Sequence, residues 1–246
     1  MAIIYGIHAV QSVVRHQADT VKVLFYDKKR NDQRLQQLLD MANSQGISCV
    51  PASRAQLDEK ASDSRHQGVV VEAVERNHNL DLDDLLASLQ EPAFLLILDG
   101  VTDPHNLGAC LRTAEAAGVH AVIYPKDKSA GLNATVRKVA CGAAEVIPTY
   151  AVTNLARTLE ELKQKGIWIV GAAGEADTSI YNMDLSGPMA LVMGAEGEGM
   201  RRLTREHCDY LAHLPMAGTV SSLNVSVATG VCLFEMVRQR SAKNSR

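Results

Sequence analysis

Residues 214–230 have the sequence LPMAGTVSSLNVSVATG, and small side chains fill most of its positions. An apolar segment ends at Pro215, a loop follows through Gly218 and Ser222, and a helix is expected to begin around Asn224. So long a run of small residues predicts that a ligand, or another segment of the chain, lies directly against this backbone.

The residues before this loop predict an α/β domain. Apolar strands are expected at FLLILDG, VHAVIYP, EVIPTY, IWIVGAAG, MALVMGAEG and YLAHLP, and helices at 106–118, 132–143 and 153–166. This alternation predicts a parallel sheet covered by helices on both faces. Ligands of such sheets bind beyond the carboxyl ends of the strands. We therefore expect one site where the loops after the first, fourth, fifth and sixth of these strands converge.

A second, smaller α/β unit is expected upstream. Its helices are GIHAVQSVVRH and DQRLQQLLDMANSQG, and its three strands are VKVLFYD, ISCVPA and HQGVVVEAV. A polar, acidic segment that ends at Pro92 is expected to be a linker with one short helix. The predicted division is therefore a unit over 1–75, a linker over 76–92 and a larger domain over 93–246.

The composition is that of a globular protein, with 46% hydrophobic and 22% charged residues among 246. The net charge of −3 argues against attachment to nucleic acid by bulk charge alone, although local basic clusters remain. We see neither a signal peptide nor an apolar run of about 18 residues, so we expect a cytoplasmic protein. The five cysteines lack CxxC spacing, and no zinc site is expected.

Several familiar active-site patterns are not matched. The loop GAEGEG, which begins at Gly194, has the spacing GxxGxG rather than the GxGxxG of dinucleotide-binding loops. Its two glutamates have no His or Asp cluster beside them that would indicate a metal or glycosidase site. Ser222 lies outside a GxSxG elbow, which argues against a hydrolase. Taken alone, Asn106 is compatible with a residue that satisfies the free amides of a helix's first turn, and Arg112 with an ordinary surface side chain.

Three segments together resemble a known family. NLGACLR, LVMGAEGEGM and LPMAGTVSSLNVSVATG resemble, in order and spacing, the three motifs of the SpoU-type RNA ribose 2′-O-methyltransferases of the SPOUT superfamily. The resemblance extends from about Phe94 to Arg240. YGIHAV and HQGVV resemble the small RNA-binding domain that several members carry. Length, linker and DGVTDPHNLGACLR are most similar to members that methylate a guanosine of bacterial 23S rRNA, in the peptidyl-transferase P loop.

The resemblance implies a deep trefoil knot at the C-terminal side of the domain, with S-adenosylmethionine bound bent against the knotted backbone. Small residues would let one segment pass through a loop of another, so a bulky residue at Gly218 is expected to impair folding. Cofactor contacts are implied for Gly194, Leu214 and Leu223, with Met216 and Gly218 as further candidates.

The resemblance also implies a catalytic set of Asn106, Arg112, Glu196, Ser222 and Asn224. Arg112 matches the motif arginine, which acts as the base or positions the 2′-hydroxyl together with a phosphate. Because a guanidinium is normally always protonated, positioning is at least as well supported as deprotonation. Asn106 and Glu196 would orient Arg112 and the substrate, while Ser222 and Asn224 would hold the nucleotide.

The expected partners are 23S rRNA and a second copy of the chain, with neither a metal nor a membrane. The final helix would pack on the second copy, and the site would be completed across that interface. Lys28, Lys29 and Arg30 of the small unit would hold the rRNA, with a salt-sensitive affinity. Two alternatives remain: tRNA as the substrate, because the catalytic motifs are shared, and a non-catalytic RNA-binding protein of the same fold.

Overall fold

The computed structural model describes residues 2–62, 65–74 and 80–244, and contacts divide the chain into two compact units. The first comprises residues 1–79 with 132–146, and the second comprises residues 80–131 with 147–246. None of the helices within the described ranges combines the length and apolar character that crossing a membrane requires. The predicted boundaries at 75 and 92 stay a prediction, and part of the predicted linker lies outside the described residues.

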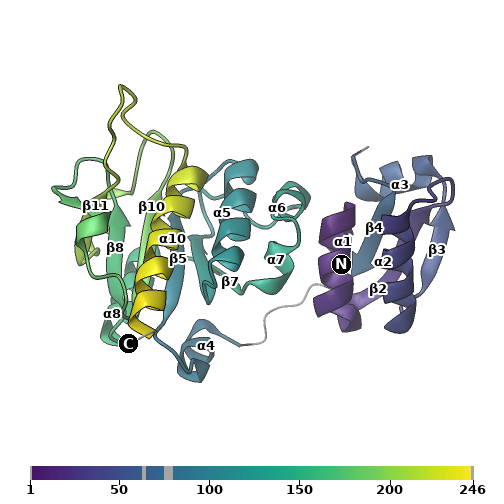
Figure 1. Ribbon diagram of the computed structural model, residues 1–246, viewed down its shortest axis with the longest axis horizontal. Helices are drawn as coiled ribbons and strands as arrows, with labels where there is room; N and C mark the ends of the chain where they lie inside the picture. Colours follow the sequence, from purple (N-terminus) through teal and green to yellow (C-terminus); the bar gives the residue numbers. More distant parts are fainter. Residues whose placement is uncertain (1, 63–64, 75–79, 245–246) are drawn as a thin grey trace. The chain divides into compact units, whose positions relative to one another are not determined.

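The first unit contains a four-stranded sheet in the order β1-β4-β2-β3, in which only β2 and β3 run parallel (Figure 1). Buried side chains of two helices, α1 and α2, share one core cluster with Val69 and Val71 of the sheet. The third helix, α3, packs its Leu57 with Val70, which points to the opposite face. The elements are β1 (Ala2–Tyr5), α1 (Ile7–His16), β2 (Val21–Asp27), α2 (Gln33–Ser44), β3 (Cys49–Ala52), α3 (Arg54–Ala61), β4 (Val69–Ala73), α6 (Ala134–Val139) and α7 (Ala143–Val146).

Four features differ from the sequence expectation, the first three in this unit and the last in a strand of the second unit. Strand β1 was not predicted, and α3 forms between the second and third predicted strands, where no helix was expected, because Ser53 and Gln56 form a reciprocal capping box at its start. The single helix predicted over 132–143 is broken into α6 and α7, because Cys141 and Gly142 both adopt left-handed backbone conformations. The strand predicted to begin at residue 145 begins at Thr149 instead.

The second unit is built on a seven-stranded parallel sheet in the order β7-β6-β5-β10-β8-β11-β9 (Figure 1). The parallel sheet predicted from the sequence is confirmed, with the two-residue strand β9 as an addition. Its elements are α4 (Leu82–Ser88), β5 (Phe94–Asp99), α5 (Pro104–Ala116), β6 (Ala121–Pro125), β7 (Thr149–Val152), α8 (Leu155–Gln164), β8 (Trp168–Ala172), β9 (Thr178–Ser179), β10 (Met189–Gly194), α9 (Arg202–Glu206), β11 (Tyr210–His213) and α10 (Val225–Asn244).

Helices cover both faces of this sheet, as the continuously apolar strands predicted. On one face, Leu159 of α8 and the leucines of α4 belong to one cluster with Leu95 and Ile97 of β5. On the other face lie α5 and α10, which contact each other where Cys110 Sγ lies 3.5 Å from Thr229 Oγ1, both side chains being buried. Helix α5 begins at Pro104 because Asp103 caps it, accepting a 3.0 Å hydrogen bond from the His105 N–H.

The strand order decides where a site can form. Strands β5, β10, β8 and β11 are adjacent and parallel, so the loops that follow them all emerge at the same edge of the sheet. They are the four loops that the sequence predicted to converge. The strand pairing therefore brings together segments that lie more than 100 residues apart in the chain, such as Asp99 and Arg201.

Candidate active site

A cavity of about 450 Å³ lies at this edge of the second unit, between the loops after β8, β10 and β11 and the start of α10. Its volume is within the range of small-molecule sites. Six residues that the sequence analysis predicted for a site line it: Gly194, Glu196, Leu214, Met216, Ser222 and Leu223. The loop from Ala172 to Glu175 forms a further wall, with Glu175 ion-paired to Arg205 of α9.

The loop after β10 folds back tightly on its own strand. Ala195 and Gly199 exchange two main-chain hydrogen bonds of 3.0 and 2.9 Å, and Gly197 and Gly199 adopt left-handed conformations. A Cβ atom on Gly194 would lie 2.2 Å from the main-chain carbon of Gly199 and 2.2 Å from the nitrogen of Met200. The GxxGxG spacing therefore serves a backbone that returns against itself.

A buried carboxylate fixes the far end of this loop. Asp99, at the end of β5, is fully buried and accepts a 2.8 Å hydrogen bond from the Arg201 N–H. Its other oxygen accepts a hydrogen bond of 2.6 Å from Arg201 Nε and lies 2.5 Å from a terminal guanidinium nitrogen. Charge-assisted contacts of this kind are among the stronger polar interactions in proteins. The sequence analysis missed this pair, because no local pattern connects the end of β5 with the residue that precedes α9.

Three polar side chains from separate segments meet beside the cavity, and Glu196 is the one of the three that lines it. Asn106 Nδ2 donates to Glu196 Oε2 at 3.2 Å, and Asn224 Nδ2 donates to Asn106 Oδ1 at 3.0 Å. Asn224 also lies 3.4 Å from the same Glu196 oxygen, and its own Oδ1 accepts from the N–H and the hydroxyl of Ser226. We call Asn106, Glu196 and Asn224 the polar cluster. It brings together three of the five residues predicted as catalytic.

The remaining predicted residues lie elsewhere. Arg112 is exposed on α5, six residues beyond Asn106, and does not line the cavity. Gly218 does not line it either, and a Cβ atom there would meet no heavy atom within 4 Å. The close approach expected at Gly218 is thus wrong for this chain by itself, because the loop around it is exposed. The tight approach occurs at Gly194 instead.

The thiols of this unit are not placed for chemistry. Burial raises the pKa of Cys110 to about 11 and that of Cys232 to about 12, so both remain protonated at neutral pH. Both are fully buried and therefore pack as small hydrophobic residues. Within the described ranges, no three His, Cys, Asp or Glu side chains are grouped so that they could hold a metal ion.

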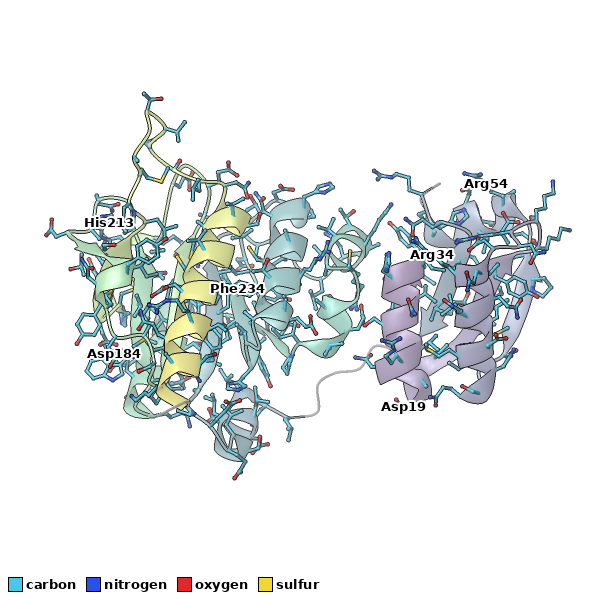
Figure 2. The ribbon with its side chains drawn as sticks, in the orientation of Figure 1. Asp19, Arg34, Arg54, Asp184, His213 and Phe234 are labelled. Atoms are coloured by element: carbon cyan, nitrogen blue, oxygen red, sulfur yellow. The ribbon has the colours of Figure 1, made fainter. Side chains whose placement is uncertain are left out.

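Two features of the surfaces bear on partners. Phe234, labelled on α10 in Figure 2, is 50% exposed although it is a large aromatic residue. The basic residues Lys28, Lys29 and Arg30 lie in the first unit, on the loop between β2 and α2. Arg30 is engaged there with Asp32 and with the main-chain oxygen of Gln67.

Comparison with known proteins gives the same picture across the whole chain. Residues 93–234 match the SpoU rRNA Methylase family, and residues 3–78 match a domain described as RNA 2′-O ribose methyltransferase substrate binding. The chain is 63% identical to the 23S rRNA (guanosine-2′-O-)-methyltransferase RlmB of Pseudomonas aeruginosa over 240 residues, which cover 96% of each chain. It is 61% identical to the enzyme of the same name from Escherichia coli, covering 97% of this chain and 98% of that one.

Among solved structures, the fold is similar to that of the SpoU methyltransferase AviRb from Streptomyces viridochromogenes in complex with AdoMet. The TM-score is 0.81 at 24% identity, over 98% of this chain and 90% of the other. At that identity the likeness concerns the fold alone. The sequence matches and the fold agree with the resemblance that the three motifs carry, and the chain belongs to the SpoU rRNA methylase family.

Proposed function

We propose that this protein transfers a methyl group from S-adenosylmethionine to the ribose 2′-hydroxyl of a guanosine in 23S rRNA, in the peptidyl-transferase P loop. Relatives at 61–63% identity over nearly the whole chain carry the name of that activity. The observation that carries the proposal is the polar cluster beside a cavity of about 450 Å³, where hydrogen bonds from Asn106 and Asn224 hold Glu196, a residue that lines the space for a ligand.

The cavity fits the cofactor in shape and in charge. Apolar side chains such as Leu214 and Leu223 can enclose a ring, and the exposed main chain of the Gly194 loop offers donors and acceptors to a base and a sugar. Glu196 and Glu198 at the same wall favour a cationic ligand. S-adenosylmethionine would supply an electrophilic methyl group on a sulfonium. The chain itself has to hold the hydroxyl in line with that methyl group.

The polar cluster would perform this positioning. Glu196, which accepts from Asn106 and Asn224, is held in one orientation and can accept a further hydrogen bond from the ribose or from Arg112. Ser222, whose side chain lines the cavity, would contact the nucleotide. Arg112 would neutralise a neighbouring phosphate and orient the 2′-hydroxyl, since a guanidinium seldom gives up a proton.

A homodimer would bring Arg112 to the cavity. Arg112 is exposed on α5 and is not among the residues that line the cavity of its own chain, so we propose a second copy as the source of this side chain. Helix α10, which packs beside α5, exposes Phe234 and Val227 by 50% and 52%. These apolar side chains support α10 as the surface on which the second copy packs.

The proposed fold contains a trefoil knot. Supporting it, the later strands β10 and β11 pair on either side of β8, so the loops that a knot would interlace emerge at one edge of the sheet. The return of residues 199 and 200 against Gly194 is a close approach within one loop and leaves no room for a side chain. Such topologies are nearly absent from proteins in general, so membership of the family is what supports this proposal.

The two parts of the chain would divide the work. The matches to residues 3–78 and 93–234 support a substrate-binding domain over 1–75, a linker over 76–92 and a catalytic domain over 93–246. Lys28 and Lys29 of the first part would contact rRNA, while Arg30, predicted with them, would hold their loop through its bonds to Asp32 and Gln67. A cytoplasmic location follows from the proposed substrate.

Labelled S-adenosylmethionine with separate 23S rRNA and tRNA pools tests the activity. Label in 23S rRNA, with alkaline hydrolysis stalling at one guanosine, is the expected result. Label in tRNA alone would make tRNA the substrate. RNA binding without label in either pool would indicate a non-catalytic RNA-binding protein.

Mixed dimers test the assignment of residues. Arg112→Ala and Glu196→Gln should each abolish methyl transfer, while calorimetry shows cofactor affinity for Arg112→Ala close to that of the unmodified protein. Mixing the two variants should restore activity in mixed dimers to about half, because one of the two sites then carries neither substitution. Mixing Glu196→Gln with Asn224→Ala is the matched control and should restore nothing, since both residues belong to the same chain's polar cluster. If activity returned in the control pair, or did not return in the test pair, Arg112 would not act at the cavity of the second copy.

A further inference from the structure

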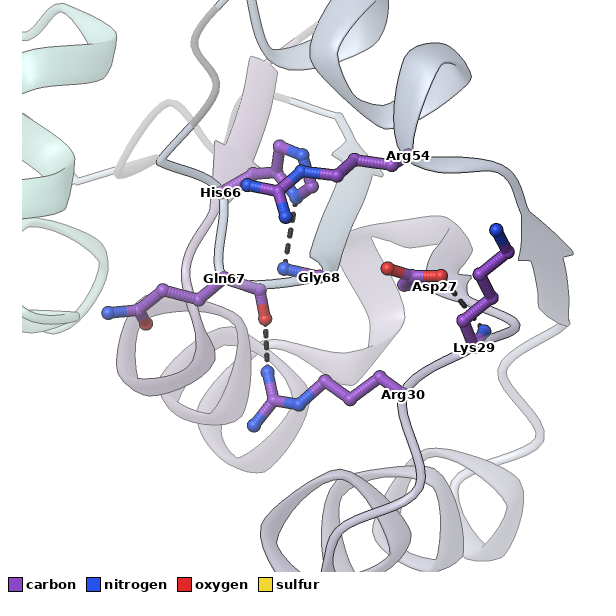
Figure 3. Close-up of a pocket in the computed structure, with 7 residues that line it drawn as sticks. All are labelled: Asp27, Lys29, Arg30, Arg54, His66, Gln67 and Gly68. Atoms are coloured by element: carbon purple, nitrogen blue, oxygen red, sulfur yellow. Dashed lines mark hydrogen bonds between the residues drawn. The ribbon is translucent and has the colours of Figure 1, made fainter.

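A second cavity, of about 350 Å³, lies entirely within the first unit. Figure 3 shows it between the loop that follows β2, the start of α3 and the turn His66–Gln67–Gly68 that leads into β4. We call this turn the HQG turn and this cavity the HQG pocket. It is separate from the candidate active site, whose lining residues all belong to the second unit.

The HQG turn is held in an unusual conformation. Gln67 and Gly68 are consecutive left-handed residues, with φ of 54° and 73°, and the first is not glycine. The Gln67 side chain accepts a 3.0 Å hydrogen bond from the Ile7 N–H and so caps helix α1. The φ of Gly68 favours glycine, and a Cβ atom there would lie 3.1 Å from Arg30 Cδ, so the Arg30 side chain would have to shift to admit it.

The His66 ring supports the turn from below. It is only 2% exposed, and its Nδ1 accepts a 3.0 Å hydrogen bond from the Gly68 N–H. Its Nε2 lies 3.1 Å from Asp58 Oδ1 and can donate to it. Both ring nitrogens thus have a partner, and the ring acts as a fixed wall of the pocket. Backbone held in sparsely populated conformations by several side chains is typical of ligand sites.

Arg30 belongs to the walls as well. It donates to the Gln67 main-chain oxygen and to both carboxylate oxygens of Asp32. The hydrogen bond from Arg30 lowers the pKa of Asp32 to about 2, so this carboxylate stays charged and keeps Arg30 neutralised at physiological pH. Arg30 therefore shapes the pocket, and the charge available to a ligand has to come from other residues.

Two cations of the pocket are available. Among the described residues, neither the Lys29 ammonium nor the Arg54 guanidinium has a hydrogen-bond or ion-pair partner. In Figure 3 the Arg54 side chain extends from the start of α3 toward His66, across the pocket from Lys29. One carboxylate, Asp27, lies between them and accepts a 2.9 Å hydrogen bond from the Lys29 N–H. Two unpaired cations against one carboxylate leave an excess of positive charge.

We propose that the HQG pocket binds a phosphodiester group of the RNA substrate, with Arg54 and Lys29 as its two contacts and the HQG turn as its floor. The proposal rests on the proposed function in that the RNA is the strand presented for methylation. A pocket of this volume admits one nucleotide unit, and a planar guanidinium matches phosphate oxygens in a bidentate fashion. The start of α3 is already satisfied by its capping box, so the side chain of Arg54 rather than the helix end provides the attraction.

The double variant Lys29→Ala/Arg54→Ala tests the contacts, with a transcript of the relevant 23S rRNA region as the probe. Fluorescence anisotropy with the full chain should show a Kd raised about tenfold near 0.1 M salt. The slope of log K against log salt should fall by about 0.7 for each lost phosphate contact. Arg15→Ala/Lys22→Ala is the matched control, because it removes the same charges from exposed positions of the same unit outside the pocket. Equal effects of the two double variants would overturn the proposal.

Asp27→Asn gives a test in the opposite direction. Asparagine can still accept from the Lys29 N–H, but it removes the one negative charge of the pocket, so RNA affinity should rise two- to fivefold. A purely structural role of this pocket predicts no gain, and an unchanged or weaker affinity would contradict the proposal. Inorganic phosphate at constant ionic strength separates the two sources of a phosphate group. If it displaces RNA at submillimolar concentration, the site is one for free phosphate and the assignment to an RNA strand is wrong.

Methyl-transfer kinetics keep this proposal separate from the proposed function. The Lys29→Ala/Arg54→Ala variant should raise KM for RNA while leaving kcat at saturating RNA and cofactor affinity unchanged. If the unmodified protein methylates no RNA but the differences in anisotropy persist, the proposed function fails and the pocket assignment stands. If methylation proceeds with the same KM in both double variants, the pocket assignment fails alone.

Discussion

Two loops at the same edge of the large sheet are rich in small residues, but their glycines have different structural roles. The loop after β10 has no room for a side chain at Gly194, where the backbone of residues 199 and 200 lies within 2.2 Å of a Cβ position. The loop after β11 contains Gly218, around which a Cβ atom would meet nothing within 4 Å. Small residues in a sequence thus indicate either a close backbone approach, as at Gly194, or an open segment that a ligand or a second chain can cover, as at Gly218. Only the structure separates these two cases.

The largest expected effect is that of Gly194→Ala. The new methyl group would overlap main-chain atoms, which cannot move without breaking the two hydrogen bonds between Ala195 and Gly199. We expect a loss of more than about 3 kcal/mol in the free energy of unfolding, together with loss of cofactor binding. Denaturant titration and calorimetry measure the two quantities. A stable variant that still binds the cofactor would show that the close backbone approach at Gly194 is not required for folding.

The next effect concerns the anchor of the same loop. Asp99→Asn replaces a buried carboxylate that accepts three contacts from Arg201, and we expect a loss of about 2 kcal/mol in stability. The expected loss is moderate because the Arg201 side chain is 44% exposed and partly solvated. Asp103→Asn is the matched control, because an asparagine caps α5 as well as an aspartate. Equal stabilities of the two variants, measured by urea unfolding, would show that the anchor adds nothing.

A smaller effect is the pH dependence of stability that arises from Cys208, whose thiol packs against β8 close to Met200 of the tight loop. A Cβ on Gly171 would lie 2.7 Å from Met200 Cε and 2.8 Å from Cys208 Sγ, so both side chains pack closely on that strand. Burial raises the pKa of the Cys208 thiol from 9.0 to about 12. Because the folded thiol stays protonated to higher pH, its stabilisation is complete below pH 9 and is lost as the pH rises toward 12.

The Cys208→Ala variant isolates that titration. Between pH 8 and pH 10 the unmodified protein should lose about 1 kcal/mol more stability than the variant, as measured by urea unfolding at each pH. Parallel curves would mean that the thiol is not shielded. Exposed Cys141 offers an internal reference for thiol reagents, which should modify it faster than Cys208.

The smallest effect is expected at Gly218. Gly218→Ala should change the free energy of unfolding by less than about 0.5 kcal/mol, since the added methyl group meets only open space. A thermal melt beside that of Gly194→Ala makes the contrast directly. A large loss of stability in Gly218→Ala would mean that another segment lies close to Gly218 after all, as the sequence alone had suggested.

The fold followed from the sequence wherever a local pattern carried the information. The apolar strands of the large sheet and most of its helices lie where their periodicity predicted, because burial on both faces leaves continuous apolar runs. Helix α3 was missed because it buries only Leu57 and Ala61, although the capping box at Ser53 was a readable signal. Strand β9 has two residues and offers no pattern.

The site was predictable to a lesser extent. The loops were expected to converge, and the structure brings Asn106, Glu196 and Asn224 into contact. The pair of Asp99 and Arg201 could not be predicted, because it joins residues 102 positions apart through the pairing of β5 with β10. The HQG pocket was also invisible, since Arg54 looks like one more surface residue until the turn opposite it is known.

Helix α10 has a consequence for the order of synthesis. Val225 and Ala228, at its start, form part of the wall of the larger cavity, and its other end is tied back to earlier chain by Gln239, which accepts from the Leu185 N–H. A nascent chain that has made every strand of the sheet therefore still lacks one wall of this cavity. The ability to bind a ligand there arises only after the sheet is complete, so a partly translated chain cannot sequester it.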